Sequence, residues 1–486
     1  MSFQEPLAFV VYLLFMLSIG IYFFIKDRNG GEKTYFLGDR KMGAWVSALS
    51  AGASDMSAWV LMGLPTAIYC KGMGQVWIPI GLALGYSLSW IFEAPRLRKF
   101  TVVFGDSITI PQFLSNRFLA KSHALQVICA VVFLVAYTIY SASSVKACGT
   151  LFNKITGMDS NLAMYLAALV IVGYTFLGGF SAVCWTDFFQ GLLVVGAMFL
   201  APLFAVFTLE TIAPEAQCLP GGLWDNFTDV PTIVSGLAWG LGYFGMPHII
   251  IRFIAIKSQK ELRKSSVIGI SWTALVVIFA ALIGLIGRNV IPYTAEIAGK
   301  ELVFVEMVRR IFPALMSGVL LSAVLAAAMS TADSQLLAAS SAFSCDVYKP
   351  LIRQGKANDV ELLWIGRLLV LIIALLALLI AMDPHAGTIM ALVENAWGVF
   401  GAAFGPAILL AIFWRHFNLP GAIAGIVVGS VVDVLWIVTL KNCTGVYELL
   451  PGFFAGLVAA IVVALCTKAP SAEVQEMYQK AVETEE

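Results

Sequence analysis

The sequence contains little charge and no excess of either sign. Asp, Glu, Lys and Arg make up 12% of the 486 residues, whereas 60% of the residues are hydrophobic. A soluble domain carries about 25% charged residues, so water is not the main solvent of this chain. The formal net charge is zero, which argues against a global basic surface for nucleic acid and against an acidic tail.

Histidine and cysteine are also scarce. The four histidines are dispersed, and the eight cysteines form no CxxC pair. We therefore expect neither a zinc site nor a disulfide framework. No nucleophile, pair of acids, phosphate loop or metal-ligand spacing indicates catalysis, so we expect that the protein is not an enzyme. The cysteines are Cys70, Cys129, Cys148, Cys184, Cys218, Cys345, Cys443 and Cys466.

Long hydrophobic runs recur along the chain instead. Runs of about 20 apolar residues are long enough to cross a hydrocarbon core of about 30 Å as a helix, and they lack the alternation of a β-barrel. The first run has no basic region before it and no cleavage site after it, so we interpret it as a retained helix. The thirteen expected spans are 6–25, 43–70, 75–93, 124–145, 161–180, 188–208, 231–251, 266–287, 312–342, 362–382, 386–413, 420–440 and 450–467.

The basic residues are distributed unevenly between the two sides of these spans. If the N-terminus lies outside, 22 of the 30 Lys and Arg residues, Arg28 among them, fall in inner segments. Basic residues are retained on the cytoplasmic side of membranes. The sequence therefore predicts an external N-terminus and a cytoplasmic C-terminus. Residues 108–118, between the third and fourth spans, fit either a short interfacial helix or a plain loop.

Two of the expected spans contain segments that fit a continuous helix poorly. Residues 50–57 read Ser-Ala-Gly-Ala-Ser-Asp-Met-Ser, and residues 235–247 contain four glycines and a proline. Two interrupted spans, five apart, are typical of an inverted five-plus-five repeat, in which unwound segments expose carbonyls to a cation and half-helix N-termini to an anion. The alternative is that the glycines only allow close helix packing.

The ninth span offers a complementary surface. Ala327, Ser330 and Thr331 are spaced at i, i+3 and i+4 and share one helix face. Two hydroxyls beside a carbonyl suit a small alkali ion, which prefers oxygen ligands. The alternative is that these hydroxyls bond back to their own helix.

These segments resemble the sodium/solute symporter family, and within it the bacterial sodium/proline symporters. The resemblance is carried by residues 48–57, 239–248 and 329–331 and extends along nearly the whole chain. Further matching stretches are 138–143, 181–187, 397–406 and 468–471.

The resemblance implies a sodium site and residues linked to it. The ion would be held by the carbonyls of Ala53, Met56 and Ala327 and the hydroxyls of Ser330 and Thr331.

Three charged residues are also implied by the resemblance. Sodium binding would depend on Asp55, which should be paired, hydrogen-bonded or near the ion because it lies within a span. Asp187 would lie on the sodium exit path, although an acid near a helix N-terminus is also favoured by the helix dipole. Arg40 would lie near the inner gate, or it simply sets the topology.

A substrate site for L-proline is implied as well. Proline needs an anion site for its carboxylate, an acceptor or aromatic face for its ammonium, and an apolar wall for its ring. Without the resemblance, aromatic residues at these positions would be interpreted as packing residues. The implied substrate residues are Ser57, Trp59, Tyr140, Trp239, Tyr243 and Pro247.

Three residues depart from the pattern. A glycine is expected after Ser57, and Ala58 adds a methyl group close to the implied pocket, which bears on substrate preference. Glu394 and Asp433 are acids within spans that the family pattern does not predict. Each is either a structurally paired group or a proton-coupled group.

The sequence thus predicts an all-α membrane protein with about 13 helices and a LeuT-like inverted-repeat core. We expect it to import L-proline with sodium across the bacterial inner membrane, with lipid around it and no nucleic acid or obligatory protein partner. Symport of another small solute is the main alternative, and a passive channel is a weaker one. The expected divisions are one transporter domain at 1–468, its core at about 43–413, peripheral helices at about 6–25, 420–440 and 450–467, and a cytoplasmic tail at 469–486.

Overall fold

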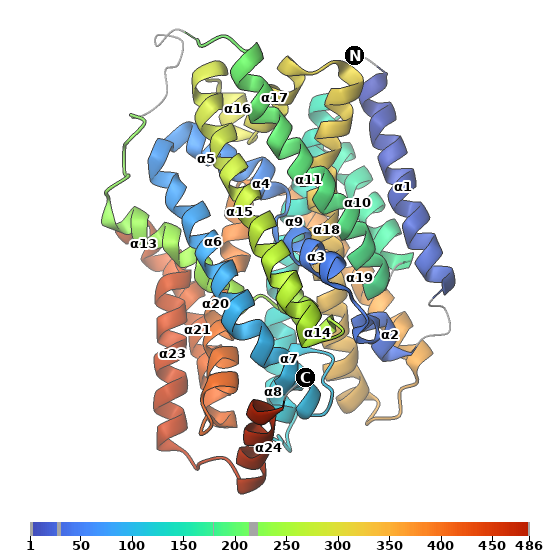
Figure 1. Cartoon of the computed structure of the whole chain (residues 1–486), viewed down its shortest axis with the longest axis vertical. Coiled ribbons are helices and arrows are strands. Elements are labelled where there is room, and N and C mark those ends of the chain that lie inside the picture. Colours follow the sequence, from blue (N-terminus) through green and yellow to red (C-terminus); the bar gives the residue numbers. More distant parts are fainter. Residues whose placement is uncertain (1–2, 27–30, 178, 213–221, 485–486) are drawn as a thin grey trace.

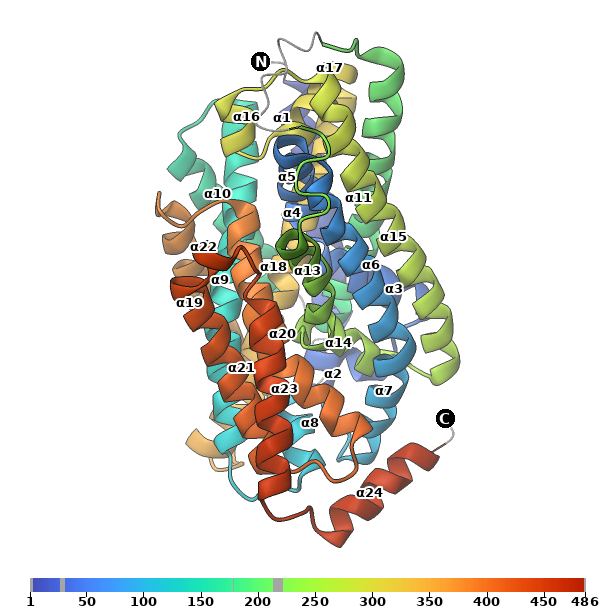
Figure 2. The ribbon, with the colours of Figure 1, turned by 90° about the vertical axis from the view of Figure 1, so that its left-hand side faces the viewer.

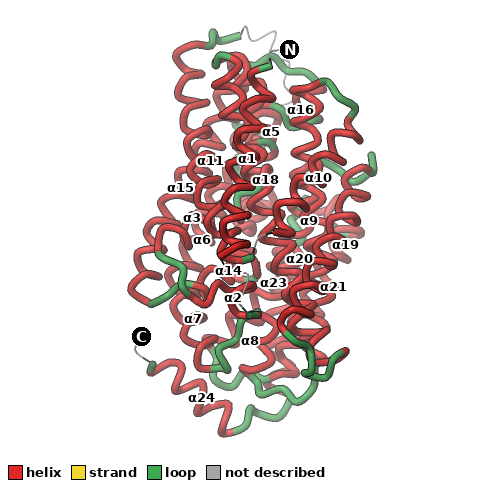
Figure 3. Tube along the Cα trace, turned by 90° about the vertical axis from the view of Figure 1, so that its right-hand side faces the viewer, coloured by secondary structure: helices red, strands yellow, loops and turns green. Residues whose placement is uncertain are grey.

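The computed structural model describes residues 3–26, 31–177, 179–212 and 222–484 (Figure 1). Arg28 and Cys218, which entered the sequence analysis, lie outside the described residues. Helices and loops account for all of the described part, and Figure 3 shows no strand in it. An isolated parallel bridge joins Met42 to Ile256.

The helices follow one another along the chain with short connections. The first half contains α1 (Gln4–Lys26), α2 (Glu32–Leu37), η1 (Gly38–Arg40), α3 (Ala44–Asp55), α4 (Ala58–Leu61), α5 (Gly63–Lys71), η2 (Gly72–Val76), α6 (Trp77–Leu88), η3 (Ser89–Glu93), α7 (Ala94–Val103), α8 (Ile110–Arg117), α9 (Ala124–Thr156), α10 (Ser160–Leu177) and α11 (Phe180–Thr208).

The second half begins at Val230. It contains α13 (Val230–Ala238), η4 (Trp239–Phe244), α14 (Pro247–Ala255), α15 (Gln259–Val290), α16 (Ala295–Gly299), α17 (Val303–Ile311), α18 (Ala314–Phe343), η5 (Ser344–Ile352), α19 (Asp359–Met382), α20 (Ile389–Phe413), α21 (Leu419–Thr439), α22 (Lys441–Thr444), α23 (Leu449–Cys466) and α24 (Ala472–Glu483).

The long helices form a bundle along the vertical axis of Figure 1. Ten of them, within the described residues, are long and apolar enough to cross a membrane, or eleven if the bent pair 230–244 and 247–255 is one span. The predicted count of thirteen therefore stays a prediction. Two predicted spans account for the difference from eleven. The third shares the run from Ala58 to Val103 with the end of the second, and the fifth is matched by Ser160–Gly173, which counts only as a shorter apolar helix.

The centre of the bundle is formed by α18 and α20. In each of these helices 78% of the most apolar stretch is buried, compared with 33% in α1, α21 and α23. α18 packs against α3, α4, α9 and α11, and Figure 1 shows α3 and α4 beside it. The helices α20, α21 and α23 stand together on one side of the molecule (Figure 2). The broken helices therefore contact the most buried helix of the fold.

Both interrupted spans are broken, as the sequence predicts. α3 ends at Asp55, Met56 has φ −81° and ψ 70°, and Ser57 is extended with ψ −174° before α4 begins. In the other span, the 3-10 helix η4 follows α13, and α14 starts at Pro247 after a bend of 44°. Proline fits the first turn of α14 because the missing N–H has no helical partner there.

The glycines of the second broken span also allow close packing. A methyl group at Gly85 of α6 would lie 2.1 Å from the carbonyl oxygen of Gly240, and one at Gly242 would lie 1.9 Å from Trp397 Nε1. Real side chains do not approach so closely. The glycines were expected either to break the helix or to allow close helix packing. The structure shows both, because the same segment unwinds and packs tightly.

Residues 110–117 form the helix α8, which the sequence left open between helix and loop. Its Thr109 cap accepts a hydrogen bond from the Gln112 N–H. Phe113 and Arg117 are fully buried, so this helix is covered by protein. Part of that cover is α24, whose Tyr478 ring lies 4.9 Å from the Arg117 guanidinium. The docking of the tail as a helix was not predicted from the sequence.

Replacing Gly85 with alanine should destabilise the protein, because the added methyl group overlaps the Gly240 carbonyl. Overpacking of this kind costs about 1–3 kcal/mol. We expect a lower midpoint of thermal unfolding for the purified protein in detergent. Gly173→Ala on α10 is the matched control, since nothing lies within 4 Å of its added methyl group. Equal midpoints for the two variants would contradict the packing described.

Candidate functional site

The break after α3 releases backbone carbonyls from their helical partners. In a continuous helix the Ser57 N–H would bond to the Ala53 carbonyl, but it bonds to the Asp55 carbonyl at 2.9 Å. Likewise, the Val60 N–H bonds to the Ser57 carbonyl rather than to the Met56 carbonyl. The carbonyls of Ala53 and Met56 are therefore free of the helix ladder, as an ion site would require.

The freed Ala53 carbonyl faces two hydroxyls on α18. Ser330 Oγ lies 2.8 Å from the Ala53 oxygen and 3.1 Å from the Ala327 oxygen, and Thr331 Oγ1 lies 3.5 Å from the Ala53 oxygen. All four residues are buried. Ser330 thus contacts both its own helix and the broken one. The structure brings Ala53, Ala327, Ser330 and Thr331 together, and Met56 lies three residues after Ala53 at the break.

The chemistry of this oxygen cluster fits an alkali ion. Its members are neutral carbonyls and hydroxyls, and hard cations with low charge prefer such oxygens. A transition-metal centre is not indicated, because no group of three or more His, Cys, Asp or Glu suited to a metal occurs among the described residues.

Asp55 lies at the end of α3 and is fully buried. Its Oδ2 accepts a hydrogen bond of 2.7 Å from the Tyr243 hydroxyl on η4, while Oδ1 has no partner. A second contact joins the two breaks, because His248 Nε2 on α14 lies 3.1 Å from the Ser54 carbonyl oxygen. The two broken spans therefore hold each other at the point where each unwinds. The His248 contact could not be predicted from the sequence, since no other histidine or metal-ligand residue is paired with it there.

Asp187 lies deeper in the fold than a helix dipole would require. It is about two turns into α11 and fully buried, and its Oδ2 pairs with Arg252 at 3.1 Å and accepts from Ser50 at 2.6 Å. Arg252 also donates to Ser50 and Ser334. This network links α3, α11, α14 and α18. From the sequence, Arg252 was only a topology charge, so its role as the partner of Asp187 was missed.

Aromatic rings enclose the space beside the break. Trp239 lies 5.5 Å from Trp59 and 5.2 Å from Tyr447, measured between ring centroids, and Tyr243 lies 5.1 Å from Trp397. These rings come from α4, η4, α20 and the connection between α22 and α23. Tyr447 and Trp397 were not predicted as site residues.

Several polar atoms inside this enclosure have no partner. The Tyr140 hydroxyl on α9 is buried and unpartnered, as are Trp59 Nε1 and Asp55 Oδ1. The neighbours of the Tyr140 hydroxyl include Asp55, Ser57 and Trp59. Buried polar groups are nearly always hydrogen-bonded, so this group of atoms marks a place for a polar ligand. Ala58 is also buried at the break.

Pro247 lies on the other side of the site, toward α8. It lines a cavity of about 20 Å³ together with Arg252, Ser334 and Thr109. A cavity of this size holds a water molecule or two and no amino acid.

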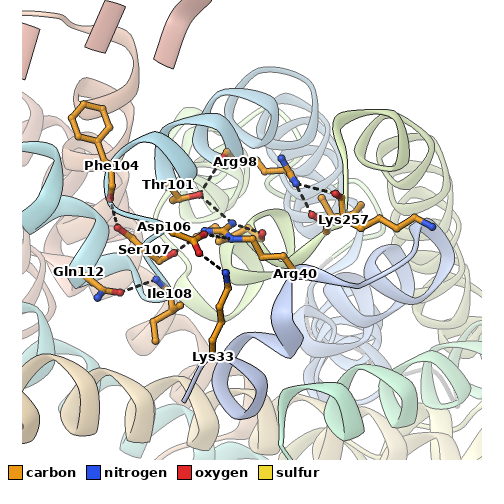
Figure 4. A network of polar contacts seen from close by, with 12 residues as sticks. Lys33, Arg40, Arg98, Thr101, Phe104, Asp106, Ser107, Ile108, Gln112 and Lys257 are labelled. Carbon is orange, nitrogen blue, oxygen red and sulfur yellow. Dashed lines mark hydrogen bonds and ion pairs between the residues drawn. The ribbon is translucent and has the colours of Figure 1, made fainter. Parts of the chain in front are cut away.

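Arg40 closes the same end of the molecule through a polar network (Figure 4). Its guanidinium bonds to Asp106 Oδ1 at 2.8 Å, to the Ile254 carbonyl at 2.6 Å and to the Ser107 carbonyl at 3.0 Å. Lys33 also pairs with Asp106. The segment that contains η1 is thus tied to the end of α14 and to the α7–α8 loop. The inner gate that the resemblance implies at Arg40 would lie here.

Asp106 holds its negative charge at neutral pH. Partial burial by itself raises the pKa of this carboxyl, but the hydrogen bond from Lys33 and the charge of Arg40 outweigh burial and lower the pKa below its usual range. The contribution of this charge to the closed network is therefore present at neutral pH and is lost only as the pH falls through the lowered pKa.

Known proteins resemble this chain over nearly its whole length. Residues 35–429 match the family model described as the sodium:solute symporter family. An osmoregulated proline transporter of Bacillus subtilis (strain 168) is 42% identical over 97% of this chain and 96% of its own length. A sodium/proline symporter of Staphylococcus aureus (strain USA300 / TCH1516) is 40% identical over 98% of this chain and 95% of its own length.

Solved structures show the same fold at low sequence identity. A sodium-coupled sialic acid symporter in an outward-open state aligns with a TM-score of 0.77 at 20% identity, covering 97% of this chain and 99% of the other. The transporter MhsT in complex with L-phenylalanine aligns with a TM-score of 0.53 at 14% identity, covering 87% and 98%. These likenesses confirm the expected all-α, LeuT-like fold.

Removing the partner of Asp187 should destabilise the fold strongly. Arg252→Met leaves a buried carboxylate unpaired, and breaking a buried pair in this way costs about 3–5 kcal/mol. The double variant Arg252→Met/Asp187→Leu should recover part of the loss. Thermal unfolding in detergent measures both effects. Lys264→Met, which breaks an exposed pair with Glu261, is the control and should change little. If Arg252→Met has the same midpoint of thermal unfolding as Lys264→Met, the Arg252–Asp187 pair does not stabilise the fold.

Neutralising Asp106 should loosen the closed gate. In Asp106→Asn, Arg40 and Lys33 lose their counterion, so we expect faster reaction of a cysteine placed at Ser341, which lines the cavity beyond the gate, with a water-soluble thiol reagent. Acidification through the lowered pKa should have the same effect. Asp39→Asn is the control, because Asp39 forms an ion pair with the exposed Lys41 and accepts a hydrogen bond from Thr34, which an amide oxygen can also accept. Equal labelling rates in the two variants would disprove the gate.

Proposed function

The chain belongs to the sodium:solute symporter family, and from this premise we propose that it imports L-proline together with sodium by alternating access. Two relatives, 42% and 40% identical over nearly their whole length, are named as proline carriers. The solved sodium-coupled neighbour supports coupling to sodium. The observation that carries the ion assignment is the Ala53 carbonyl, which the break releases toward two hydroxyls of α18.

Sodium is proposed to bind between the broken span and α18. The carbonyls of Ala53, Met56 and Ala327 and the hydroxyls of Ser330 and Thr331 would coordinate it. Each is neutral, so the ion adds a net positive charge close to Asp55, whose Oδ1 has no hydrogen-bond partner. Asp55 would therefore favour the ion by charge without coordinating it.

Proline is proposed to occupy the aromatic enclosure. The unpartnered Trp59 N–H and Tyr140 hydroxyl, with the Ser57 hydroxyl, can donate to the carboxylate. The faces of Trp239 and Tyr243 provide an apolar wall for the ring and a π-surface for the ammonium group. Pro247, at the start of α14, would lie on the exit path from this enclosure.

The contacts between the two broken spans couple sodium binding to proline binding. Sodium fixes the end of α3 to α18, and Asp55 and Ser54 in turn hold Tyr243 and His248 of the second broken span. Proline then binds to a pocket whose two halves are already positioned. Release to the cytoplasm requires opening of the gate at Arg40 and of the network around Asp187.

The driving force is sufficient for accumulation. A tenfold inward sodium gradient contributes about 1.4 kcal/mol, and a membrane potential of about 100 mV contributes about 2.3 kcal/mol per charge. One ion per cycle therefore supports a proline gradient of roughly 500-fold.

The orientation and divisions of the chain are also proposed. The excess of Lys and Arg in the inner segments supports an external N-terminus and a cytoplasmic C-terminus in the bacterial plasma membrane. One transporter domain would cover residues 1–468, and the tail would end in α24 on the cytoplasmic side. No obligatory protein partner is proposed.

Uptake by purified protein in lipid vesicles tests this function. An inward sodium gradient should drive accumulation of labelled proline, and collapse of the gradient should abolish it. Unlabelled proline should compete better than other amino acids, carboxylates or sugars. If another solute competes better than proline, the protein is a symporter for that solute. Ala58 is then the residue that would account for the different substrate preference. Uptake that persists without the gradient would indicate a channel.

Thr331→Ala should weaken sodium dependence and leave the fold intact. Loss of one oxygen ligand is expected to cost about 1–2 kcal/mol, which raises the half-saturating sodium concentration roughly 5- to 30-fold. The measurement is proline uptake as a function of sodium. Ser322→Ala is the matched control, because Ser322 is a buried hydroxyl on the same helix that bonds to its own Gly318 carbonyl. If both variants show the same sodium dependence, Thr331 is not a ligand.

A further inference from the structure

A second set of buried charges lies behind the aromatic enclosure, between α20, α21 and α23. Lys441 Nζ lies 3.2 Å from Glu394 Oε1 and 2.8 Å from Glu448 Oε2. The side chains of Lys441 and Glu394 are about one quarter exposed, whereas Glu448 is fully buried. Glu394 is therefore a structurally paired acid, which is one of the two roles that the sequence left open.

Asp433 has no such pairing. It is fully buried on α21, and neither of its carboxylate oxygens has a hydrogen-bond donor. The side chain faces Glu448, because a methyl group at Gly398 of α20 would lie 2.8 Å from Asp433 Oδ1 and 3.2 Å from Glu448 Cγ. The Asp433 carboxyl group and the buried Glu448 side chain thus lie against the same backbone position, which only glycine can occupy.

The charges around Asp433 do not balance if every acid is ionised. The groups that face it are Glu394 on α20, Lys441 on α22, Glu448 at the start of α23 and the phenol of Tyr447. The helix α9 also packs on α21 but adds no charge to this set among the described residues. Lys441 can neutralise only one of three carboxylates. Two carboxyl groups in such a position share a proton.

We propose that Asp433, which lies beside the buried Glu448 and has no cation of its own, binds the one proton of this carboxyl pair and forms a proton site separate from the sodium and substrate sites. The proton enters from the side of Glu394 and Lys441, which are in contact with solvent. A metal ion is a poorer occupant, since no metal-ligand cluster is present in the described part of the chain. Binding adds only the proton to the carboxylate pair, and no other bond changes.

The site is connected to the substrate enclosure by Tyr447. This residue directly precedes Glu448, donates a hydrogen bond of 2.9 Å to the Glu394 carbonyl, and stacks on Trp239. When the proton leaves, repulsion between two buried anions separates the start of α23 from α21. Tyr447 then moves away from Trp239, and the wall of the enclosure loosens. External pH should therefore control the affinity for substrate.

Infrared spectroscopy of the purified protein tests the site without any substrate. A protonated carboxyl gives a C=O band that a carboxylate lacks. Other buried acids such as Glu93 can contribute a band of this kind, so the Asp433 band is the component that Asp433→Asn removes from the wild-type spectrum. We expect this component at neutral pH and its loss as the pH is raised. Asp383→Asn, which alters an exposed acid in the α19–α20 loop, should retain the band. A band that is missing from the wild type, that persists in Asp433→Asn, or that does not respond to pH overturns the proposal. Loss of the band on addition of sodium at constant pH would assign the site to a cation and also overturn it.

Uptake assays test the connection, which rests on the proposed function. The half-saturating proline concentration of the wild type should rise several-fold as the external pH increases, whereas Asp433→Asn should show no such rise. Glu448→Gln replaces Asp433→Asn if the latter does not fold. An unchanged pH profile together with a titrating infrared band would disprove the connection but leave the proton site. Absence of any proline uptake would instead disprove the proposed function.

Discussion

The contact between the Ala53 carbonyl and Ser330 is the interaction on which the account depends. Within a membrane every backbone carbonyl needs a partner, because water is not present to provide one. The break after Asp55 removes the helical partner of Ala53, and the most buried helix of the bundle supplies a hydroxyl at 2.8 Å instead. A cation can replace that hydrogen bond with a stronger set of contacts. The cost of unwinding the helix is thereby linked to ion binding.

The other contacts of the site connect the first broken span to the rest of the bundle. Tyr243 and His248 connect the first break to the second, and the Asp187–Arg252 pair connects both to α11 and α18. These side chains are buried, so movement of one broken span changes the partners of the other. On the gate side, Arg40 secures the end of α14. The proposed gate at Arg40 and the proposed site thus lie at different levels of the same bundle and are linked through α14.

Local sequence patterns predicted the breaks and the polar face of α18, because glycine, proline and hydroxyl residues are rare within apolar helices and their spacing fixes which face they share. Long-range partners were not predictable in this way. Arg252 looked like one of many basic residues at a helix end, and His248 had no neighbour in the sequence that could mark it. The tail helix α24 was missed because its docking depends on Tyr478 meeting Arg117, which lies far away in the chain.

An experimental structure determined with sodium and proline would test the central claim most directly. Density for a cation should lie within coordination distance of the Ala53 and Ala327 carbonyls and of Ser330 and Thr331, and proline should lie against Trp239. The Ser330 hydroxyl should then point its oxygen at the ion and no longer donate to Ala53. A sodium ion bound elsewhere, with the Ser330 to Ala53 hydrogen bond intact, would contradict the account.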